Sequence, residues 1–171
     1  LPEINPRSEE TVTHIVEDSI EGWSDACNAL ISSYCKHPSL NEFYFSKKIR
    51  FDYSQIRPKG AFISGGFKAP GPDGLKRALE NIEALLDKNT GAFKSIVAYD
   101  IYMHLCDAVL SGGVRRSAFN VVIDEDDDEM INAKMNRYFE NKLISEFLDR
   151  MPATFNNKWM NFMEIDYSFM L

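Results

Sequence analysis

The chain has 171 residues, and its 19 basic and 26 acidic side chains give a net charge of −7 at neutral pH. This length fits one domain with a hydrophobic core, and the hydrophobic share of 44% argues against a disordered chain. The acidic balance argues against sequence-independent binding to nucleic acid, which needs clustered lysines and arginines. Apolar stretches stay well short of the roughly 20 residues of a membrane-spanning helix, so we expect a soluble protein with no membrane partner.

The cysteines Cys27, Cys35 and Cys106 are too few and too irregularly spaced to indicate a disulfide framework or a zinc site. We therefore expect a reducing, cytoplasmic location. The chain opens with leucine and carries no signal-peptide pattern, which indicates a piece of a longer protein. We expect one partial domain over residues 1–171, in which residues 1–15 lead into the domain and residues 151–171 remain unassigned.

The first predicted helix follows Leu1 to Arg7, which form a strand or linker. Asp18 and Glu21 have the spacing of a capping box, so the helix is expected to start at Asp18. Apolar residues then recur at helical spacing up to His37-Pro38, and this face is expected to pack on a core: Ile20, Trp23, Cys27, Leu30, Ile31 and Tyr34. Alternating apolar and polar residues predict a strand over Lys48 to Gln55.

The segment from Arg57 to Pro72 holds four glycines and three prolines and is predicted to be a loop. A helix begins at about Pro72-Asp73, ends at Asn89-Thr-Gly91, and carries one apolar stripe: Leu75, Ala78, Leu79, Ile82, Leu85 and Leu86. The next helix, Ile96 to Leu110, is apolar around most of its circumference, so we expect it to be buried on several sides.

Three further elements are predicted towards the C-terminus. A short buried strand covers Ala118 to Ile123, and the acidic run Asp124 to Glu129 opens a helix that reaches about Tyr138. Another helix lies near Glu140 to Leu148. The acidic run complements the positive end of its helix and lacks the alternating ligands and central glycine of a calcium-binding loop.

Two loops are candidates for binding chemistry. In Ser111-Gly-Gly-Val-Arg-Arg-Ser-Ala118 the glycines permit a close backbone approach, and the adjacent guanidinium groups offer forked donors for phosphate or a base edge. A helix C-cap with solvated arginines explains the same pattern. The Arg57 to Pro72 loop fits either an anion-facing loop at a helix N-terminus or a mobile surface loop, and it has neither P-loop nor dinucleotide-binding order.

Other reactive residue types have simpler interpretations. Asp18-Ser19 is a helix start first and a ligand contact second. The scattered histidines, His14, His37 and His104, are taken as structural. Cys27 and Cys106 fall within apolar helices and are expected to be small core residues.

Four segments in order carry a resemblance to a known family: Val16-Glu-Asp-Ser-Ile-Glu-Gly-Trp23, Ile56-Arg-Pro-Lys-Gly-Ala61, Gly65-Gly-Phe-Lys-Ala-Pro-Gly-Pro72 and Ser111-Gly-Gly-Val-Arg-Arg-Ser-Ala118. Together they resemble the large catalytic chain of ribonucleotide reductases, and most of all its adenosylcobalamin-dependent, monomeric class II type, which reduces triphosphates. The resemblance spans about Val16 to Lys134. It implies an α/β fold that is part of the ten-stranded reductase barrel.

The resemblance also implies roles for particular residues. The R-x-x-G-x-x-I loop of the family surrounds a deoxynucleotide effector and corresponds to Arg57, Gly60 and Ile63, while Asp18, with Ser19 beside it, helps to hold the effector sugar. The second loop links the effector to the ribonucleotide substrate. Its substrate-binding matches are Gly112, Gly113, Arg115, Arg116 and Ser117.

The chain departs from the family in several places. Gly65 to Pro72 is one residue longer than the family's G-G-x-x-S-G-P and lacks its serine, and Arg150 to Asn157 only weakly matches the family's R-x-x-x-N-N-S. The radical and reducing cysteines of the family lie outside the matched region, so no catalytic residue is assigned. The complete enzyme is expected to use adenosylcobalamin, whose contacts are not in this segment, and a thioredoxin-like reductant together with the rest of the reductase chain. A separate nucleotide-binding regulatory module or split subunit without catalysis, or a scaffold fragment whose loops bind nothing, would fit the same residues.

Overall fold

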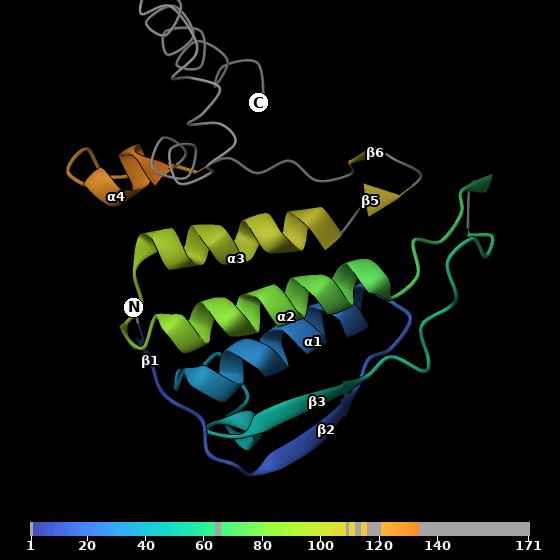
Figure 1. Cartoon of the computed structure of the whole chain (residues 1–171), viewed down its shortest axis with the longest axis horizontal. Coiled ribbons are helices and arrows are strands. Elements are labelled where there is room, and N and C mark those ends of the chain that lie inside the picture. The colour runs from blue at the N-terminus through green and yellow to red at the C-terminus, as the bar shows by residue number, and fades with distance from the viewer. Residues whose placement is uncertain (1, 64–65, 109, 112–113, 116–120, 134–171) are drawn as a thin grey trace, which may run out of the picture. The chain divides into compact units, whose positions relative to one another are not determined.

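The computed structural model describes residues 2–63, 66–108, 110–111, 114–115 and 121–133 (Figure 1). The chain divides into two compact units, Leu1–Ser117 and Ala118–Leu171, which are described separately below. The single partial domain over residues 1–171 stays a prediction. The predicted helix near Glu140 to Leu148 and the unassigned residues 151–171 lie outside the described residues.

The first unit is built around a strand-helix-strand arrangement. Strands β2 (Thr11–Ile15) and β3 (Lys48–Asp52) pair in parallel, with Thr11 opposite Lys48 and Ile15 opposite Asp52. A parallel pair needs a long crossover, and α1 (Ile20–Tyr34) supplies it, followed by a single 3₁₀ turn, η1 (Glu42–Tyr44). This is an α/β arrangement, as the sequence predicts.

Two further helices complete the core of this unit. Helix α2 (Asp73–Lys88) packs between α1 and α3 (Ser95–Ala108), as Figure 1 shows. Short strands lie at both ends: β1 (Glu3–Ile4) pairs antiparallel with β4 (Gly91–Ala92), and β5 (Leu110–Ser111) pairs antiparallel with β6 (Val114–Arg115). The core unites residues of β1 and the three helices with residues that follow β2 and β3, among them Ile4, Val16, Leu30, Tyr34, Ile56, Leu79, Leu86, Val97 and Ile101.

Helix α2 confirms its prediction closely. It starts directly after Pro72, which is its N-cap, and ends at Asn89. The predicted apolar stripe is almost wholly buried, and Leu85 alone of its six members remains partly exposed. This buried stripe is the contribution of α2 to the hydrophobic core.

The described part of the second unit holds one short helix, α4 (Asp128–Ile131). It begins inside the acidic run, as predicted, and the carboxylate of Asp127 accepts a hydrogen bond from the backbone N–H of Met130 at 3.0 Å. The positive end of a helix therefore meets acidic side chains. Whether the helix continues to Tyr138 concerns residues outside the described part.

The start of α1 differs from its prediction. The N-cap is Ser19 rather than Asp18, because the Ser19 hydroxyl accepts the hydrogen bond from the N–H of Gly22, while the Asp18 carboxylate turns to Arg57. Ile20 was expected on the buried face but is 87% exposed. It lies in the first turn, before the helix reaches the core that begins with Trp23 and Ala26.

The strands also differ from their predictions. Strand β3 ends at Asp52 rather than Gln55, because the Asp52 carboxylate accepts a hydrogen bond from the N–H of Ser54 and turns the chain. The predicted strand over Ala118 to Ile123 is wrong for its described residues. Val121, Val122 and Ile123 are exposed and belong to no strand. A strand needs a neighbour to pair with, and no described residue pairs with these three.

Helix α3 ends at Ala108, short of the predicted Leu110, which belongs to β5. It is not buried on several sides as expected. Val97, Ile101 and Ala108 are buried, whereas Tyr102 is 51% exposed and most other positions are half-buried. One stripe of the helix packs on α2, and apolar composition around the rest does not by itself create a second packing partner.

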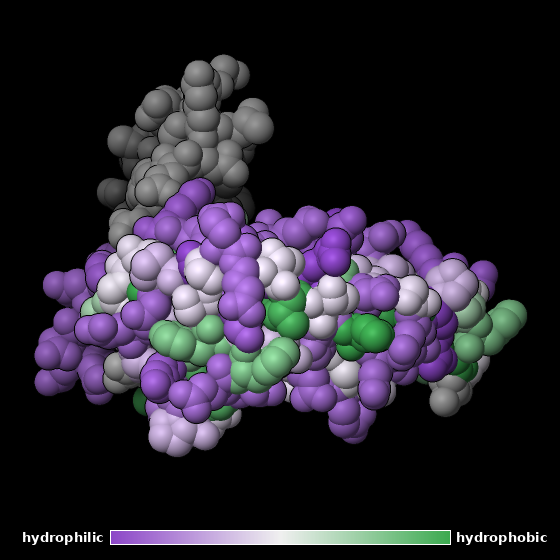
Figure 2. Space-filling view, turned by 90° about the horizontal axis from the view of Figure 1, so that it is seen from below, coloured by the Kyte–Doolittle hydropathy of each residue, from purple (hydrophilic) through white to green (hydrophobic). Residues whose placement is uncertain are grey.

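The side of the molecule on which β2 and β3 lie is largely hydrophilic, with small separate hydrophobic patches (Figure 2). None of the helices in the described part of the chain combines the length and the apolar character needed to cross a bilayer.

Candidate functional site

The structure brings Asp18 and Arg57 together, although 39 positions separate them in the sequence. Asp18 directly precedes the N-cap of α1, and Arg57 opens the loop that follows β3. The Nε of Arg57 donates a hydrogen bond to the Oδ2 of Asp18, and the two side chains form an ion pair. The side chain of Arg57 is 43% exposed and that of Asp18 is 28% exposed, so a ligand in solution can reach both.

A glycine in α1 positions Asp18. A Cβ on Gly22 would lie 2.6 Å from both the Cβ and the carbonyl oxygen of Glu17, a separation that no real side chain could keep. The absence of a side chain therefore lets the chain pass close over the first turn of α1. The buried Val16 anchors the segment, and Asp18 is held at the positive end of the helix. The motif in the sequence contains Gly22, but only the structure shows why a glycine is needed at this position.

The loop from Arg57 to Pro72 contains no α-helix, as predicted, but it has internal pairing. The N–H of Gly60 donates to the carbonyl of Ala69 at 2.9 Å, and the N–H of Ala69 donates to the carbonyl of Ala61 at 2.7 Å. Nearer the tip, the N–H of Ile63 donates to the carbonyl of Phe67 at 2.9 Å. The loop is a narrow hairpin rather than an unstructured connection.

Gly71 closes the base of this hairpin. Its φ of +75° is a conformation that side chains disfavour, and a Cβ there would lie 2.9 Å from the backbone nitrogen of Lys59. Gly60 also has a positive φ, of +90°, but its missing Cβ would point into open space. Gly71 therefore allows the two arms of the hairpin to touch, while Gly60 serves the turn of the backbone.

The hairpin loop is the cationic part of an acidic protein. From residue 53 to residue 72 the chain carries Arg57, Lys59 and Lys68 and no acidic side chain. Two aromatic side chains lie towards its tip, with Phe62 79% and Phe67 47% exposed. Guanidinium and ammonium groups bind phosphates, and exposed aromatic rings offer apolar faces on which a base can stack.

The second candidate loop starts beside the end of the first. A Cβ on Gly74, in the first turn of α2, would lie 2.9 Å from the carbonyl oxygen of Ala108, the last residue of α3. The first loop ends where α2 begins, and the second begins where α3 ends. Both loops therefore leave the same end of the α2–α3 pair, which Figure 1 shows beside β5 and β6.

Only part of the second loop can be placed. The backbones of Val114 and Arg115 form β6, whereas Gly112, Gly113, Arg116 and Ser117 lie outside the described residues. The substrate-binding role of this loop stays a prediction.

Neither Cys27, in α1, nor Cys35, at its C-cap, is an activated nucleophile. Burial raises the pKa of the Cys27 thiol to about 11, and burial also raises the pKa of Cys35. Cys27 packs against the core, as expected for a structural cysteine. Within the part of the chain that the structure describes, no three histidine, cysteine or acidic side chains gather closely enough to hold a metal ion.

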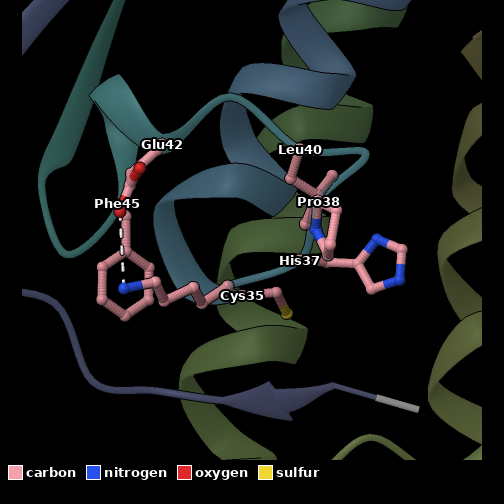
Figure 3. Close-up of a pocket in the computed structure, with 7 residues that line it drawn as sticks. Cys35, His37, Pro38, Leu40, Glu42 and Phe45 are labelled. Atoms are coloured by element: carbon pink, nitrogen blue, oxygen red, sulfur yellow. Dashed lines mark ion pairs between the residues drawn. The ribbon is translucent and has the colours of Figure 1, made fainter.

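A cavity of about 280 Å³ lies at the opposite end of α1 from Asp18 (Figure 3). Lys36 lines the cavity, where its Nζ forms an ion pair with Glu42 at 3.4 Å and lies over the ring of Phe45. The other lining residues are Cys35, His37, Pro38 and Leu40. The sequence pattern gives no sign of this cavity, and its position at the C-terminal end of α1 separates it from the Asp18–Arg57 pair.

Comparison with solved structures defines the class of protein first. A crystal structure of a B12-dependent, class II ribonucleotide reductase matches with a TM-score of 0.58 and 28% sequence identity, over 74% of this chain and 17% of that chain. The described fold is thus that of a part of this class of reductase. The expected fold class, part of the α/β barrel, is confirmed.

Sequence relatives give the particular family. Adenosylcobalamin-dependent ribonucleoside-triphosphate reductases of Lactobacillus delbrueckii subsp. bulgaricus and Lactobacillus leichmannii are 34% and 32% identical over 130 residues, 75% of this chain. The same enzyme of Lactobacillus acidophilus is 28% identical over 157 residues, 90% of this chain. No family model matches.

The resemblance seen in the sequence is therefore confirmed. The chain belongs with the large catalytic chain of adenosylcobalamin-dependent ribonucleotide reductases, as a partial match to it. It spans 17% of the length of the two first-named relatives and 21% of the third.

Proposed function

We propose that this chain is the part of a ribonucleoside-triphosphate reductase that binds the deoxynucleotide effector and passes its identity to the substrate site. The complete enzyme would reduce ribonucleotides to deoxyribonucleotides for DNA synthesis by radical chemistry. The observation that carries the proposal is the meeting of Asp18 and Arg57 at the start of α1. These residues match two separate effector-binding motifs of the family.

The effector site would consist of Asp18, Ser19, Arg57, Gly60 and Ile63. Arg57 supplies forked donors for a phosphate, and Asp18 supplies an acceptor for a sugar hydroxyl. The Ser19 hydroxyl already accepts from the N–H of Gly22, which leaves its own O–H free to donate to the ligand. Gly60, with its positive φ, allows the backbone to turn at this point of the site.

The substrate side of the proposal concerns the second loop. Gly112, Gly113, Arg115, Arg116 and Ser117 would contact the ribonucleotide, with the two arginines as the main donors. The proposal is supported by the contact between the first turn of α2 and the end of α3, since the first loop ends there and the second begins there. An effector that favours one arrangement of the first loop can then bias the second, by as much as its affinities for the two arrangements differ.

The cofactor and the catalytic groups belong to other parts of the complete enzyme. The relatives are named as adenosylcobalamin-dependent, and that cofactor would supply the radical that starts the reduction. Its contacts would lie in other parts of the reductase, as the resemblance implies. The raised pKa of Cys27 and Cys35 argues against either as the reducing thiol.

The partners of the proposed enzyme follow from the same assignment. They are a ribonucleotide substrate, a deoxynucleotide effector, a thioredoxin-like reductant and the remaining reductase chain, with no role for nucleic acid. The rest of the chain is expected to supply neighbours for the β2–β3 pair, because a two-stranded sheet is marginal by itself.

The proposal predicts that Arg57→Ala weakens effector binding by about 10- to 100-fold, the effect of losing charge-assisted hydrogen bonds to phosphate. The measurement is the substrate preference of a reductase that contains this segment, with and without each deoxynucleotide. The variant should lose most of the effector-dependent change. Lys88→Ala, at the far end of α2, is the matched control and should keep it. An unaltered preference in Arg57→Ala would contradict the proposed role.

A further inference from the structure

The ion pair at the proposed effector site involves two groups that a nucleotide would need. Arg57 and Asp18 are bonded to each other, and both side chains are partly open to solvent. Ion pairs at such exposure contribute little to stability, because water and salt screen the two charges. The paired and the separated side chains therefore have similar free energies, and a competing ion can replace either partner. The pair therefore joins the two side chains in this structure and is weak enough for a competing anion to open it.

The carboxylate of Asp18 occupies a position that suits an anion in general. Two independent features favour negative charge there, the guanidinium of Arg57 and the positive end of α1, whose N-cap is the next residue, Ser19. A polyphosphate carries more negative charge than a carboxylate and accepts more of the donors of one arginine. It should therefore compete successfully for Arg57.

We infer that the Asp18–Arg57 ion pair is an internal latch that a nucleotide opens by exchanging partners. The phosphate chain takes the guanidinium of Arg57, and the released carboxylate of Asp18 accepts a hydrogen bond from a sugar hydroxyl. This inference rests on the proposed effector site and adds how the site is closed when no nucleotide is bound. It gives Asp18 two opposite effects: it competes with the phosphates and binds the sugar.

The latch has a mechanical consequence for the hairpin loop. In the closed arrangement the loop is tied through Arg57 to the start of α1. The loop base is also internally fixed, by the Gly60–Ala69 hydrogen bond and by the contact of Gly71 with Lys59. A change of partner at Arg57 would therefore act on the base of the hairpin as a unit.

The test uses two ligands and one variant in a reductase that contains this segment. Inorganic tripolyphosphate has the phosphates without the sugar, and a deoxynucleoside triphosphate has both. In Asp18→Asn the latch is lost, so tripolyphosphate should bind about two- to fivefold more tightly, the range expected for one exposed ion pair. The deoxynucleoside triphosphate should gain less or bind more weakly, because the amide is a poorer acceptor for the sugar hydroxyl.

The control is Glu17→Gln, which removes the same charge from the neighbouring exposed residue and leaves the pair intact. It should change both affinities by the same small factor. If Asp18→Asn fails to fold, Asp18→Ser is the second neutral variant, since it removes the charge and leaves the N-cap Ser19 in place. Equal tightening of both ligands, or weakening of both, would overturn the latch. Failure of the effector site itself would look different: Arg57→Ala would then leave both affinities unchanged.

Discussion

At the scale of single residues, His14 links the β2–β3 pair to its surroundings through a ring that is hard to protonate. Its Nδ1 lies 2.8 Å from the hydroxyl of Tyr44, and the rings of Tyr44 and Phe51 meet it edge-on. Its Nε2 is buried and has no hydrogen-bond partner among the described residues. Burial lowers the pKa of His14, and the charge of Asp25 opposes this only in part.

This lowered pKa predicts a pH dependence of stability. The unfolded chain binds a proton at His14 near the ordinary pKa of about 6.5, whereas the folded chain resists protonation until lower pH. The free energy of unfolding should therefore fall as the pH drops below about 6.5, and His14→Gln should reduce this fall. Urea unfolding at about pH 7.5 and 5.5 measures it. His37→Gln, at an exposed position, should keep the full fall. An equal fall in His14→Gln would show that this ring does not contribute.

At the scale of elements, α2 and α3 are in close contact at Gly74 and Ala108. The 2.9 Å between a Cβ at Gly74 and the carbonyl oxygen of Ala108 is too short for any real side chain. The glycine therefore sets how closely the first turn of α2 can approach the last turn of α3. Since the first candidate loop ends at this contact and the second begins beside it, the spacing here also sets how far apart the two loops lie at this point.

This contact predicts that Gly74→Ala destabilises the chain, against the usual trend. In an open helix the exchange of glycine for alanine stabilises by about 0.5–1 kcal/mol. Here the added methyl group must push the two helix ends apart, so we expect a loss of about 1–3 kcal/mol. Urea unfolding measures the change, and Arg77→Ala, exposed on the same helix, should stay within about 0.5 kcal/mol of the parent. A stabilised Gly74→Ala would show that the helix ends are free to separate.

The elements show where sequence patterns suffice. The stripe from Leu75 to Leu86 was enough to predict α2, because its apolar residues keep one helical period and its ends carry a proline and an asparagine. Strand β2 was not predicted. Its residues, Thr11 to Ile15, alternate between exposed and half-buried positions and none is fully buried. Pairing with β3 makes it a strand, and that pairing joins segments that are distant in the chain.

Patterns misled where a neighbour decides the outcome. Ala118 to Ile123 has the composition of a buried strand, yet its described residues are exposed, since composition cannot supply a pairing partner. Helix α3 is apolar around most of its surface, but contact with α2 buries only one stripe of it. A segment is buried only where another part of the chain packs on it, and the sequence of the segment alone does not show whether such a partner is present.

At the scale of the whole molecule, charge is distributed unevenly. The chain carries a net charge of −7, while residues 53–72 carry three cations and no acidic side chain. An acidic protein tends to repel free nucleotides, so a local cationic loop favours their approach at that place. This distribution agrees with binding to a small anion.

The candidate site could be predicted in part. Arg57, Gly60, Ile63, Asp18 and Ser19 came from motif resemblance, whereas spacing alone left the loop as either a phosphate-facing or a mobile segment. The proximity of Asp18 to Arg57 and the need for Gly22 and Gly71 required coordinates, because they depend on how distant segments approach each other. The roles of Gly112 to Ser117 remain predictions, since most of that loop lies outside the described residues.

The most direct test of the account is to locate the bound effector. Amide hydrogen exchange of a reductase that contains this segment should be measured with and without a saturating deoxynucleoside triphosphate. Exchange should slow in peptides that cover residues 17–22 and 57–63 and stay unchanged in the middle of α2. Slowed exchange confined to other parts of the enzyme, with these two peptides unaffected, would contradict the assignment of the effector site to Asp18 and Arg57.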